Sequence, residues 1–329
     1  MKIARFILLY MLELSIRFAG SMKIPGISKI IHNYDVMILD QWGVLHDGRK
    51  PYEGVIESLR EIRQNSPIKI IILSNSSKRQ ASTHQGLQKV GMSADHIDGI
   101  VTSGEIGWRR IRDRHYDFLS GKDRSLRVAV FGNADDDVEY IQSCGCILAD
   151  PKDADFILAR GSFSYSTASS NIVYKIAEDL FQHVDSYLEE CARYNLPMLV
   201  TNPDTNRPGS NAPMPGQIGQ KYSKMGMRVE YIGKPYSAVY DECYVIAESL
   251  LGRPAKGLRY CAVGDSLEHD IRGAEAAGVD SVWVMNGVHC LDLGRAEGSP
   301  IPPDDPLVES LLNKFGSSPT YSIARFCWQ

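Results

Sequence analysis

The run Ile68–Leu73 constrains the fold more than any other stretch of this sequence. It is almost purely β-branched and apolar, and it ends in the polar tetrapeptide Ser74-Asn75-Ser76-Ser77. A strand with one face in water alternates apolar and polar residues, whereas a continuous apolar run is typical of a strand buried on both faces. Strands of that kind occur in parallel sheets that carry helices on both sides.

Comparable apolar runs recur along the chain, with helical patterns between most of them. Besides Ile68–Leu73, strands are predicted at Val36–Leu39, Arg127–Phe131, Phe156–Ala159, Met198–Val200, Val229–Ile232, Tyr260–Val263 and Ser281–Val284. Helices are predicted at Glu53–Gln64, Arg79–Val90, Asp135–Gln142, Asn171–Tyr194, Ala238–Leu251, His269–Ala277 and Leu307–Lys314. This alternation predicts an α/β fold with a Rossmann-like parallel sheet.

Length and charge narrow the class of protein. A chain of 329 residues suggests about two domains as a soft prior. The net charge is −4, with acidic and basic residues interleaved, which excludes the basic face of a nucleic-acid-binding protein. Seven cysteines without a CxxC pair are expected to be reduced thiols in a reducing compartment.

Residues 1–22 are treated as an N-terminal extension, outside the fold. The apolar run Phe6–Leu14 is too short to cross a bilayer as a helix, so no stable membrane association is expected. It contains Glu13 and precedes no convincing small-residue cleavage site, which does not fit a secretory signal. A cytoplasmic protein is expected; an organelle-targeting segment and an amphipathic helix remain the alternatives for this extension.

Polar clusters follow four of the predicted strands, at Asp40, Ser74, Thr201 and Asp265. Open α/β sheets bind their ligands outside the carboxyl ends of the strands. Asp40 in that place suits a nucleophile or a metal ligand, since carboxylates act as nucleophiles in aspartyl-phosphate chemistry. Taken alone, an aspartate at a strand end is more often a turn or cap residue.

Three further positions suit phosphate chemistry. Asp265, with Asp270 five residues on, offers hard oxygen ligands of the kind Mg²⁺ prefers, although Asp265 could simply cap the next helix. Lys234 could neutralise a carboxylate or phosphate as a point charge, or be a solvated surface lysine. Ser74 and Asn75 could hold a phosphate oxygen at a helix N-terminus, or be an ordinary helix cap.

The order of these residues is more specific than any one of them. The segments ILDQWGVLHDG, ILSNSS, GKP and VGDSLEHD resemble the four ordered motifs of the haloacid dehalogenase (HAD) superfamily. TSGE at Thr102–Glu105, TNPD at Thr201–Asp204 and PGQIG at Pro215–Gly219 are similar to class IIA, the NagD and p-nitrophenyl phosphatase subgroup. The resemblance implies a core of residues 23–103 and 196–329, with an α/β cap domain at 104–195.

The resemblance also implies roles for single residues. Asp40 attacks phosphorus and forms an aspartyl-phosphate. Mg²⁺ is bound by Asp40, by the backbone carbonyl of Trp42 and by Asp265. The resemblance further implies that these groups and Lys234 converge, and that the protein is a phosphatase of a small phosphorylated metabolite.

The remaining implied roles concern the phosphoryl group and its surroundings. Ser74 and Asn75 hold the transferring phosphoryl group, and Lys234 neutralises charge between nucleophile and phosphate. Asp270 orients Lys234 or the metal-bound water, and Asn202 and Asp204 lie behind the residues that contact the phosphoryl group. Phosphoryl transfer is mostly positioning plus electrostatic stabilisation, which these residue types can supply.

Trp42 departs from the phosphatase pattern. A second aspartate two residues after the nucleophile normally protonates the leaving group, and indole has no proton that titrates near neutral pH. General acid–base help is worth ~10²–10⁴-fold, so alkyl phosphates should react slowly, and aryl or acyl phosphates less so. Three alternatives remain: His46 as a substitute acid, a dehalogenase-like hydrolase, and a pseudoenzyme that binds a phosphorylated ligand without turnover.

The cap implied by the resemblance would close over the substrate and exclude water. Within it, the hydroxyl-rich segment Ala159–Asn171 is interpreted as a serine-rich loop, with a site-facing role as the alternative. Trp108, Arg109 and Arg110 are interpreted as a solvated helix face. A homodimer paired through the cap is a further expectation from the resemblance.

Overall fold

The structure is a computed structural model and describes residues 21–207, 210, 212–296, 299 and 306–329. The predictions for residues 1–20 lie outside this part of the chain. The described residues form two compact units: unit 1 takes its residues from Met1–Ile70 and Arg253–Gln329, and unit 2 from Ile71–Gly252.

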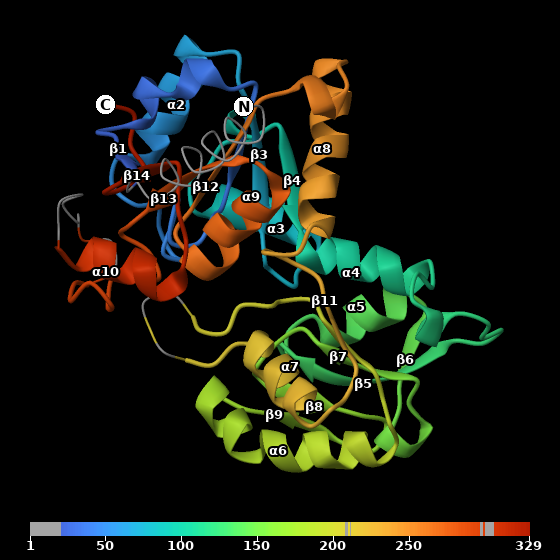
Figure 1. The fold of residues 1–329 in the computed structure, drawn as a ribbon. Coiled ribbons are helices and arrows are strands. Elements are labelled where there is room, and N and C mark those ends of the chain that lie inside the picture. The colour runs from blue at the N-terminus through green and yellow to red at the C-terminus, as the bar shows by residue number, and fades with distance from the viewer. Residues whose placement is uncertain (1–20, 208–209, 211, 297–298, 300–305) are drawn as a thin grey trace, which may run out of the picture. The chain divides into compact units, whose positions relative to one another are not determined.

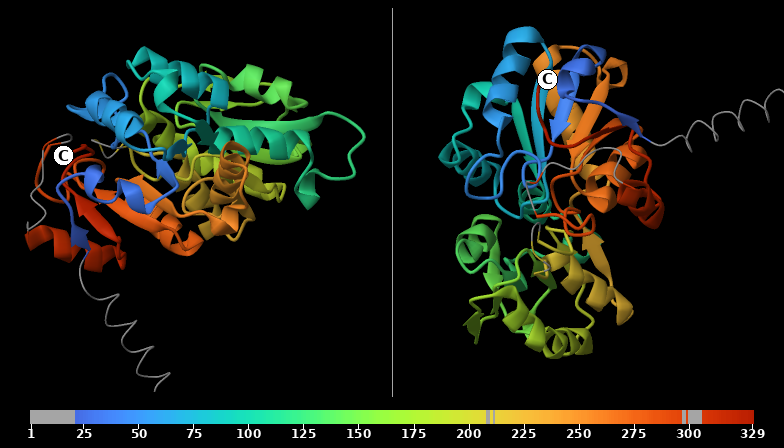
Figure 2. Two further views of the ribbon diagram at one scale, coloured as in Figure 1. Left: turned by 90° about the horizontal axis from the view of Figure 1, so that it is seen from above. Right: turned by 90° about the vertical axis from the view of Figure 1, so that its left-hand side faces the viewer.

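Unit 1 is built on parallel strands with helices. Its strands run in the order β1 (Met22–Lys23), β14 (Tyr321–Ile323), β13 (Asp280–Val284), β12 (Tyr260–Gly264) and β2 (Val36–Leu39), and each neighbouring pair is parallel. Its helices are α2 (Val55–Asn65), α9 (Arg272–Ala277) and α10 (Pro306–Phe315). Both views of Figure 2 show the C-terminal end beside the segment that follows residue 21, where Ile27 and Ser28 donate backbone hydrogen bonds to Cys327 and Trp328.

Every residue of β2 is buried, as its continuous apolar sequence predicted. β2 pairs with β12 so that Leu39 lies opposite Val263. Because both strands are parallel and in this register, they end at the same edge of the sheet. Asp40 and Asp265 follow those two ends.

Unit 2 begins within β3 (Lys69–Ser74), which pairs in parallel with β4 (Gly99–Thr102). The helices that follow or pack near these strands are α3 (Gln80–Lys89), α4 (Ser103–Arg112) and α8 (Ala238–Leu251). The two polar residues of β3, Lys69 and Ser74, stand at the strand's first and last positions. The interior of the strand is therefore as apolar as a doubly covered strand requires.

The larger sheet of unit 2 has the order β11 (Val229–Tyr231), β10 (Met198–Val200), β7 (Phe156–Ala159), β5 (Leu126–Gly132), β8 (Ser164–Ser166) and β9 (Asn171–Val173), with β6 (Cys146–Leu148) also paired to β5. The pairs of β8 are antiparallel and the others are parallel. Helices α6 (Ala177–Arg193) and α7 (Pro215–Lys224) bury apolar side chains against one face. Figure 1 shows α5 (Asp137–Ser143) on the opposite side from α6.

The predicted α/β class with a Rossmann-like parallel sheet is confirmed. The predicted domain boundaries stay a prediction. The cap domain was predicted to end at residue 195, whereas the larger sheet continues past that residue through β10 and β11. Met22, set aside with the extension, is part of β1. In the described residues, no helix is both long and apolar enough to span a membrane.

Two predictions of local structure are wrong. Asn171–Val173, predicted as the start of a helix, is strand β9, because its β-branched residues pair with β8. The serine-rich segment is not simply a loop, since Ser164–Ser166 forms β8 and is buried.

All seven cysteines are free thiols, and six of them are buried.

Candidate functional site

Three buried carboxylates meet at the carboxyl edge of the unit 1 sheet. Asp40 follows β2, Asp265 follows β12, and Asp270 lies in the π-helix Leu267–Ile271. One carboxylate oxygen from each residue lies within 4.8 Å of the others. The sequence predicted that all three take part in one site, and the structure brings them together.

The backbone holds Asp265 tightly in place. Its Oδ2 accepts a hydrogen bond of 2.6 Å from the backbone N–H of Val288. A Cβ at Gly43 would lie 1.9 Å from this oxygen, and one at Gly287 would lie 2.0 Å from it, so a side chain at either position would collide with the carboxylate. Gly43 also has φ +86°, which favours glycine. Gly287 and Val288 were missed, because nothing in their local sequence predicts a contact with Asp265.

Asp270 is fixed in a similar way. Its Oδ2 accepts a 3.0 Å hydrogen bond from the backbone N–H of Ser266, and a Cβ at Gly264 would lie 2.1 Å from its Cγ. Three buried carboxylates at this spacing repel one another unless a cation or protons neutralise them. A few carboxylate oxygens with room for water are what Mg²⁺ requires. The donor set therefore fits a divalent cation.

His289 supports the π-helix that carries Asp270. Its Nε2 accepts a 3.1 Å hydrogen bond from the backbone N–H of Leu267, and its Nδ1 lies 3.0 Å from Oδ2 of Asp292. The pairing requires a neutral ring with the proton on Nδ1. π-Helices are rare and frequently occur at functional sites. Nothing in the local sequence predicts a role for this histidine, which follows β13 rather than β12.

The buried His289 is expected to make the stability of the folded protein depend on pH. Burial lowers the pKa of His289 below its ordinary value of 6.5, although Asp292 acts to raise it. Below about pH 6.5 the unfolded chain therefore binds a proton that the folded state resists, so stability falls as pH falls. Urea denaturation between pH 8 and 5 measures this slope. His289→Gln is expected to flatten it, whereas the exposed His183→Gln is the control; equal slopes in wild type and His289→Gln would contradict the assignment.

The predicted phosphate-site residues of unit 2 are joined by hydrogen bonds. The amide oxygen of Asn75 accepts from the backbone N–H of Lys234 at 2.6 Å, and its Nδ2 donates to the Lys234 carbonyl at 3.2 Å and to Oδ1 of Asp204 at 2.8 Å. The backbone N–H of Asp204 in turn donates to Oδ1 of Asn202 at 3.1 Å. Lys234 and Asn75 are buried. One connected set therefore contains four of the predicted residues.

Ser74 is the last residue of β3 and directly precedes Asn75. Its Oγ accepts a 3.1 Å hydrogen bond from the backbone N–H of Ser76. Gly233 precedes Lys234 with φ +140°, and a Cβ there would lie 2.5 Å from Cδ of Pro203. That close approach explains why glycine stands before the lysine. The relation of this set to the carboxylates of unit 1 stays a prediction.

His46, the alternative acid, lies buried in the turn that follows β2. It is 8% exposed, and its Nδ1 accepts a 2.9 Å hydrogen bond from the backbone N–H of Gly48. Burial lowers the pKa of His46. The turn folds back on itself, since Trp42 and His46 form a β-bridge. The Trp42 ring lies against Gly48, where a Cβ would be 3.2 Å from Cζ2.

Two family models and two proteins of known activity are similar to this chain in sequence. Residues 37–146 match a family model described as haloacid dehalogenase-like hydrolase, and residues 231–313 match a HAD-hydrolase-like model. A 4-nitrophenylphosphatase of Schizosaccharomyces pombe is 25% identical over 319 residues, covering 86% of this chain and 94% of that protein. A D-glycerol 3-phosphate phosphatase of Mycobacterium tuberculosis is 25% identical over 263 residues, covering 79% and 65%.

A solved structure shares the fold. A haloacid dehalogenase-like hydrolase from Brucella suis superposes with a TM-score of 0.70 at 20% sequence identity, covering 92% of this chain and 99% of that one. At that identity the likeness establishes the architecture and not the substrate.

Proposed function

Because the chain belongs to the haloacid dehalogenase-like hydrolases, in the class of NagD and the 4-nitrophenylphosphatases, and is a phosphoric monoester hydrolase, we propose that it hydrolyses a small phosphorylated metabolite with Mg²⁺ as cofactor. Asp40 is the nucleophile in this proposal. Its carboxylate oxygen attacks phosphorus, the alcohol leaves, and water later cleaves the aspartyl-phosphate.

The meeting of Asp40, Asp265 and Asp270 carries the proposal. Asp40 and Asp265 would hold Mg²⁺, with the backbone carbonyl of Trp42 as a further ligand, and Asp270 would orient Lys234 or a water bound to the ion. The ion supplies positive charge that offsets the negative charge of the phosphoryl group. The backbone contacts at Gly43 and Val288 keep Asp265 in one orientation, so no reorganisation is needed when substrate binds.

The hydrogen-bonded set in unit 2 supports the second half of the proposal. Ser74 and Asn75 would hold the phosphoryl oxygens, and Lys234 would neutralise charge as a second catalytic group. Asn202 and Asp204 would orient Asn75, which Asp204 contacts directly. A buried lysine on a fixed backbone is preorganised for phosphate.

Trp42 favours a second candidate function, a phosphate-binding pseudoenzyme. Without an acid at this position, leaving groups that need a proton depart slowly. A metal-free dehalogenase-like hydrolase is a weaker alternative, because such chemistry has no use for the clustered carboxylates of Asp265 and Asp270.

For the domains, we propose a core of residues 23–103 and 196–329 with a cap at 104–195. The strands β10 and β11 extend the cap's sheet as far as Tyr231. The cap would exclude water during turnover and would be the surface through which a homodimer pairs.

Removal of metal tests the cofactor. The purified protein is expected to hydrolyse p-nitrophenyl phosphate in Mg²⁺, to lose this activity in EDTA and to regain it with excess Mg²⁺. Mg²⁺ should also raise the melting temperature, since a ligand that binds only the folded state stabilises it, and this rise should vanish in Asp265→Asn. Turnover that persists in EDTA would instead support the dehalogenase-like alternative. Phosphate binding without turnover would support the pseudoenzyme.

A further inference from the structure

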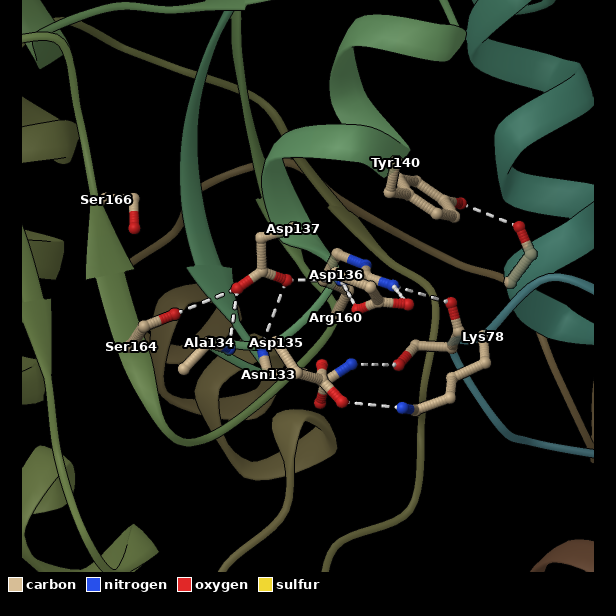
Figure 3. A network of polar contacts seen from close by, with 12 residues as sticks. Lys78, Asn133, Ala134, Asp135, Asp136, Asp137, Tyr140, Arg160, Ser164 and Ser166 are labelled. Carbon is tan, nitrogen blue, oxygen red and sulfur yellow. Dashed lines mark hydrogen bonds and ion pairs between the residues drawn. The ribbon is translucent and has the colours of Figure 1, made fainter. Parts of the chain in front are cut away.

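Arg160 is a fully buried charge in unit 2. It follows β7 at the carboxyl end of the strand, and its side chain is 0% exposed. Its Nη1 lies 2.7 Å from Oδ1 of Asp136 and also contacts Asp137, and its guanidinium lies 4.2 Å above the ring of Tyr140. Figure 3 shows the carboxylates and the guanidinium facing one another.

The guanidinium of Arg160 always carries its charge. Because that charge is buried, the side chain must lie where its carboxylate partners can pair with it. Burial acts to lower the pKa of Arg160, but Asp136 and Asp137 outweigh burial and raise it. A buried charge is tolerated only when it is paired and hydrogen-bonded. Asp137 is itself anchored, because it accepts hydrogen bonds from the backbone N–H groups of Asn133 and Ala134 at 3.0 and 2.7 Å and from Oγ of Ser164 at 3.1 Å.

This anchored group reaches the segment that follows Ser74. Nη2 of Arg160 donates a 3.2 Å hydrogen bond to the carbonyl of Ser77, while Nδ2 of Asn133 donates a 3.0 Å bond to the Ser77 hydroxyl. Beside them, Nζ of Lys78 lies 2.7 Å from Asp135 (Figure 3). Residues after β5 and β7 of the larger sheet therefore hold the turn between β3 and α3.

The same turn is also tied to α4. The backbone N–H of Gly104 donates to the Ser76 carbonyl at 3.0 Å, and Oγ1 of Thr102 donates to the Lys78 carbonyl at 2.8 Å. Ser76 and Lys78 contact α4 through neutral groups, and Arg79 forms an ion pair of 2.6 Å with Glu105 of α4 in which both side chains are partly exposed. The Lys78–Asp135 pair is exposed as well. Arg160 thus provides the fully buried charge-assisted tie to this turn, the stronger kind of hydrogen bond.

We propose that Arg160 is a positioning residue for phosphate binding, which sets the backbone of Ser74–Ser77 from the larger sheet. This inference rests on the proposed role of Ser74 and Asn75. A guanidinium can contact Asp136, Asp137 and Ser77 at once because its donors form a planar fork, whereas an ammonium group cannot span them. The sheet and the phosphate-binding turn are therefore coupled through one side chain.

Arg160→Lys tests this coupling while it keeps the positive charge. We expect the inhibition constant of orthovanadate to rise about tenfold, the loss that follows removal of one hydrogen bond from a charged donor. The concentration of Mg²⁺ needed for half-maximal activity should not change, because the carboxylates lie in unit 1. Amide hydrogen exchange of residues 74–79 should become faster in the variant.

Arg124→Lys is the matched control, since Arg124 makes a comparable fork to Asp155 with contacts of 2.7 and 2.8 Å but touches neither Ser77 nor Lys78 through any of these bonds. Unchanged exchange of residues 74–79 in Arg160→Lys would overturn the inference, as would an equal change in Arg124→Lys. Hydrogen exchange does not depend on turnover. A wild-type protein without phosphatase activity would therefore refute the proposed function, while the exchange comparison would still decide on the coupling.

Discussion

Asp40→Asn is expected to lower kcat for p-nitrophenyl phosphate by at least about 10³-fold, as the loss of a nucleophile does in other covalent mechanisms. The amide has nearly the shape of the carboxylate but cannot attack phosphorus. The measurement is single-substrate kinetics in Mg²⁺, with circular dichroism to verify that the variant folds.

Asp35→Asn makes the same change at the other end of strand β2. Asp35 precedes the strand and accepts hydrogen bonds from Arg259 at 2.9 and 3.2 Å, away from the carboxyl edge. It should reduce stability and leave kcat near that of the wild type. Turnover that survives in Asp40→Asn would remove Asp40 as the nucleophile.

Trp42→Asp is expected to increase the rate with alkyl phosphates. An aspartate two residues after the nucleophile can protonate the leaving alcohol, and such general acid help is worth ~10²–10⁴-fold. The rate with p-nitrophenyl phosphate should change much less, because its leaving group departs without a proton. The measurement is therefore the ratio of kcat/KM for glycerol phosphate and p-nitrophenyl phosphate.

Trp42→Phe is the control, since it keeps an aromatic ring and adds no acid. Its ratio should remain that of the wild type. If Trp42→Asp left the ratio unchanged as well, the proposed cause of slow alkyl phosphate turnover would be wrong, and His46 in the same turn would become the group to test.

The predictable part of the fold is the set of doubly buried strands. Val36–Leu39, Phe156–Ala159 and Met198–Val200 have the predicted bounds, because a continuous apolar run carries its own signal. The short strands β1, β4, β6, β8, β9 and β14 were missed, since the pairings that define them are not visible in their local sequence. The start of helix α4 has a recognisable sequence pattern, the capping box Thr-x-x-Glu at Thr102–Glu105. Oγ1 of Thr102 accepts a 3.1 Å hydrogen bond from the backbone N–H of Glu105, as that pattern predicts.

The site divides in the same way. Asp40, Asp265 and Asp270 were predictable because each follows an apolar strand or its helix. Asn75 and Lys234 came from the motif order, and their direct hydrogen bonds agree with a shared role. The supports at Gly287, Val288, His289 and Arg160 could not be predicted. They act through contacts between segments remote in the sequence, and no local pattern encodes such contacts.

The two units also differ in how the chain supplies them. Unit 2 is one continuous stretch, whereas unit 1 joins both ends of the chain, with β1 paired to β14 and β2 paired to β12. Domains generally fold as units while the ribosome is still adding residues. Unit 2 can therefore fold while the protein is being made, but Asp40 must wait for β12 to emerge before its carboxylate neighbours exist. The nascent chain thus completes the proposed phosphate-binding turn before the proposed nucleophile, Asp40, has its carboxylate neighbours.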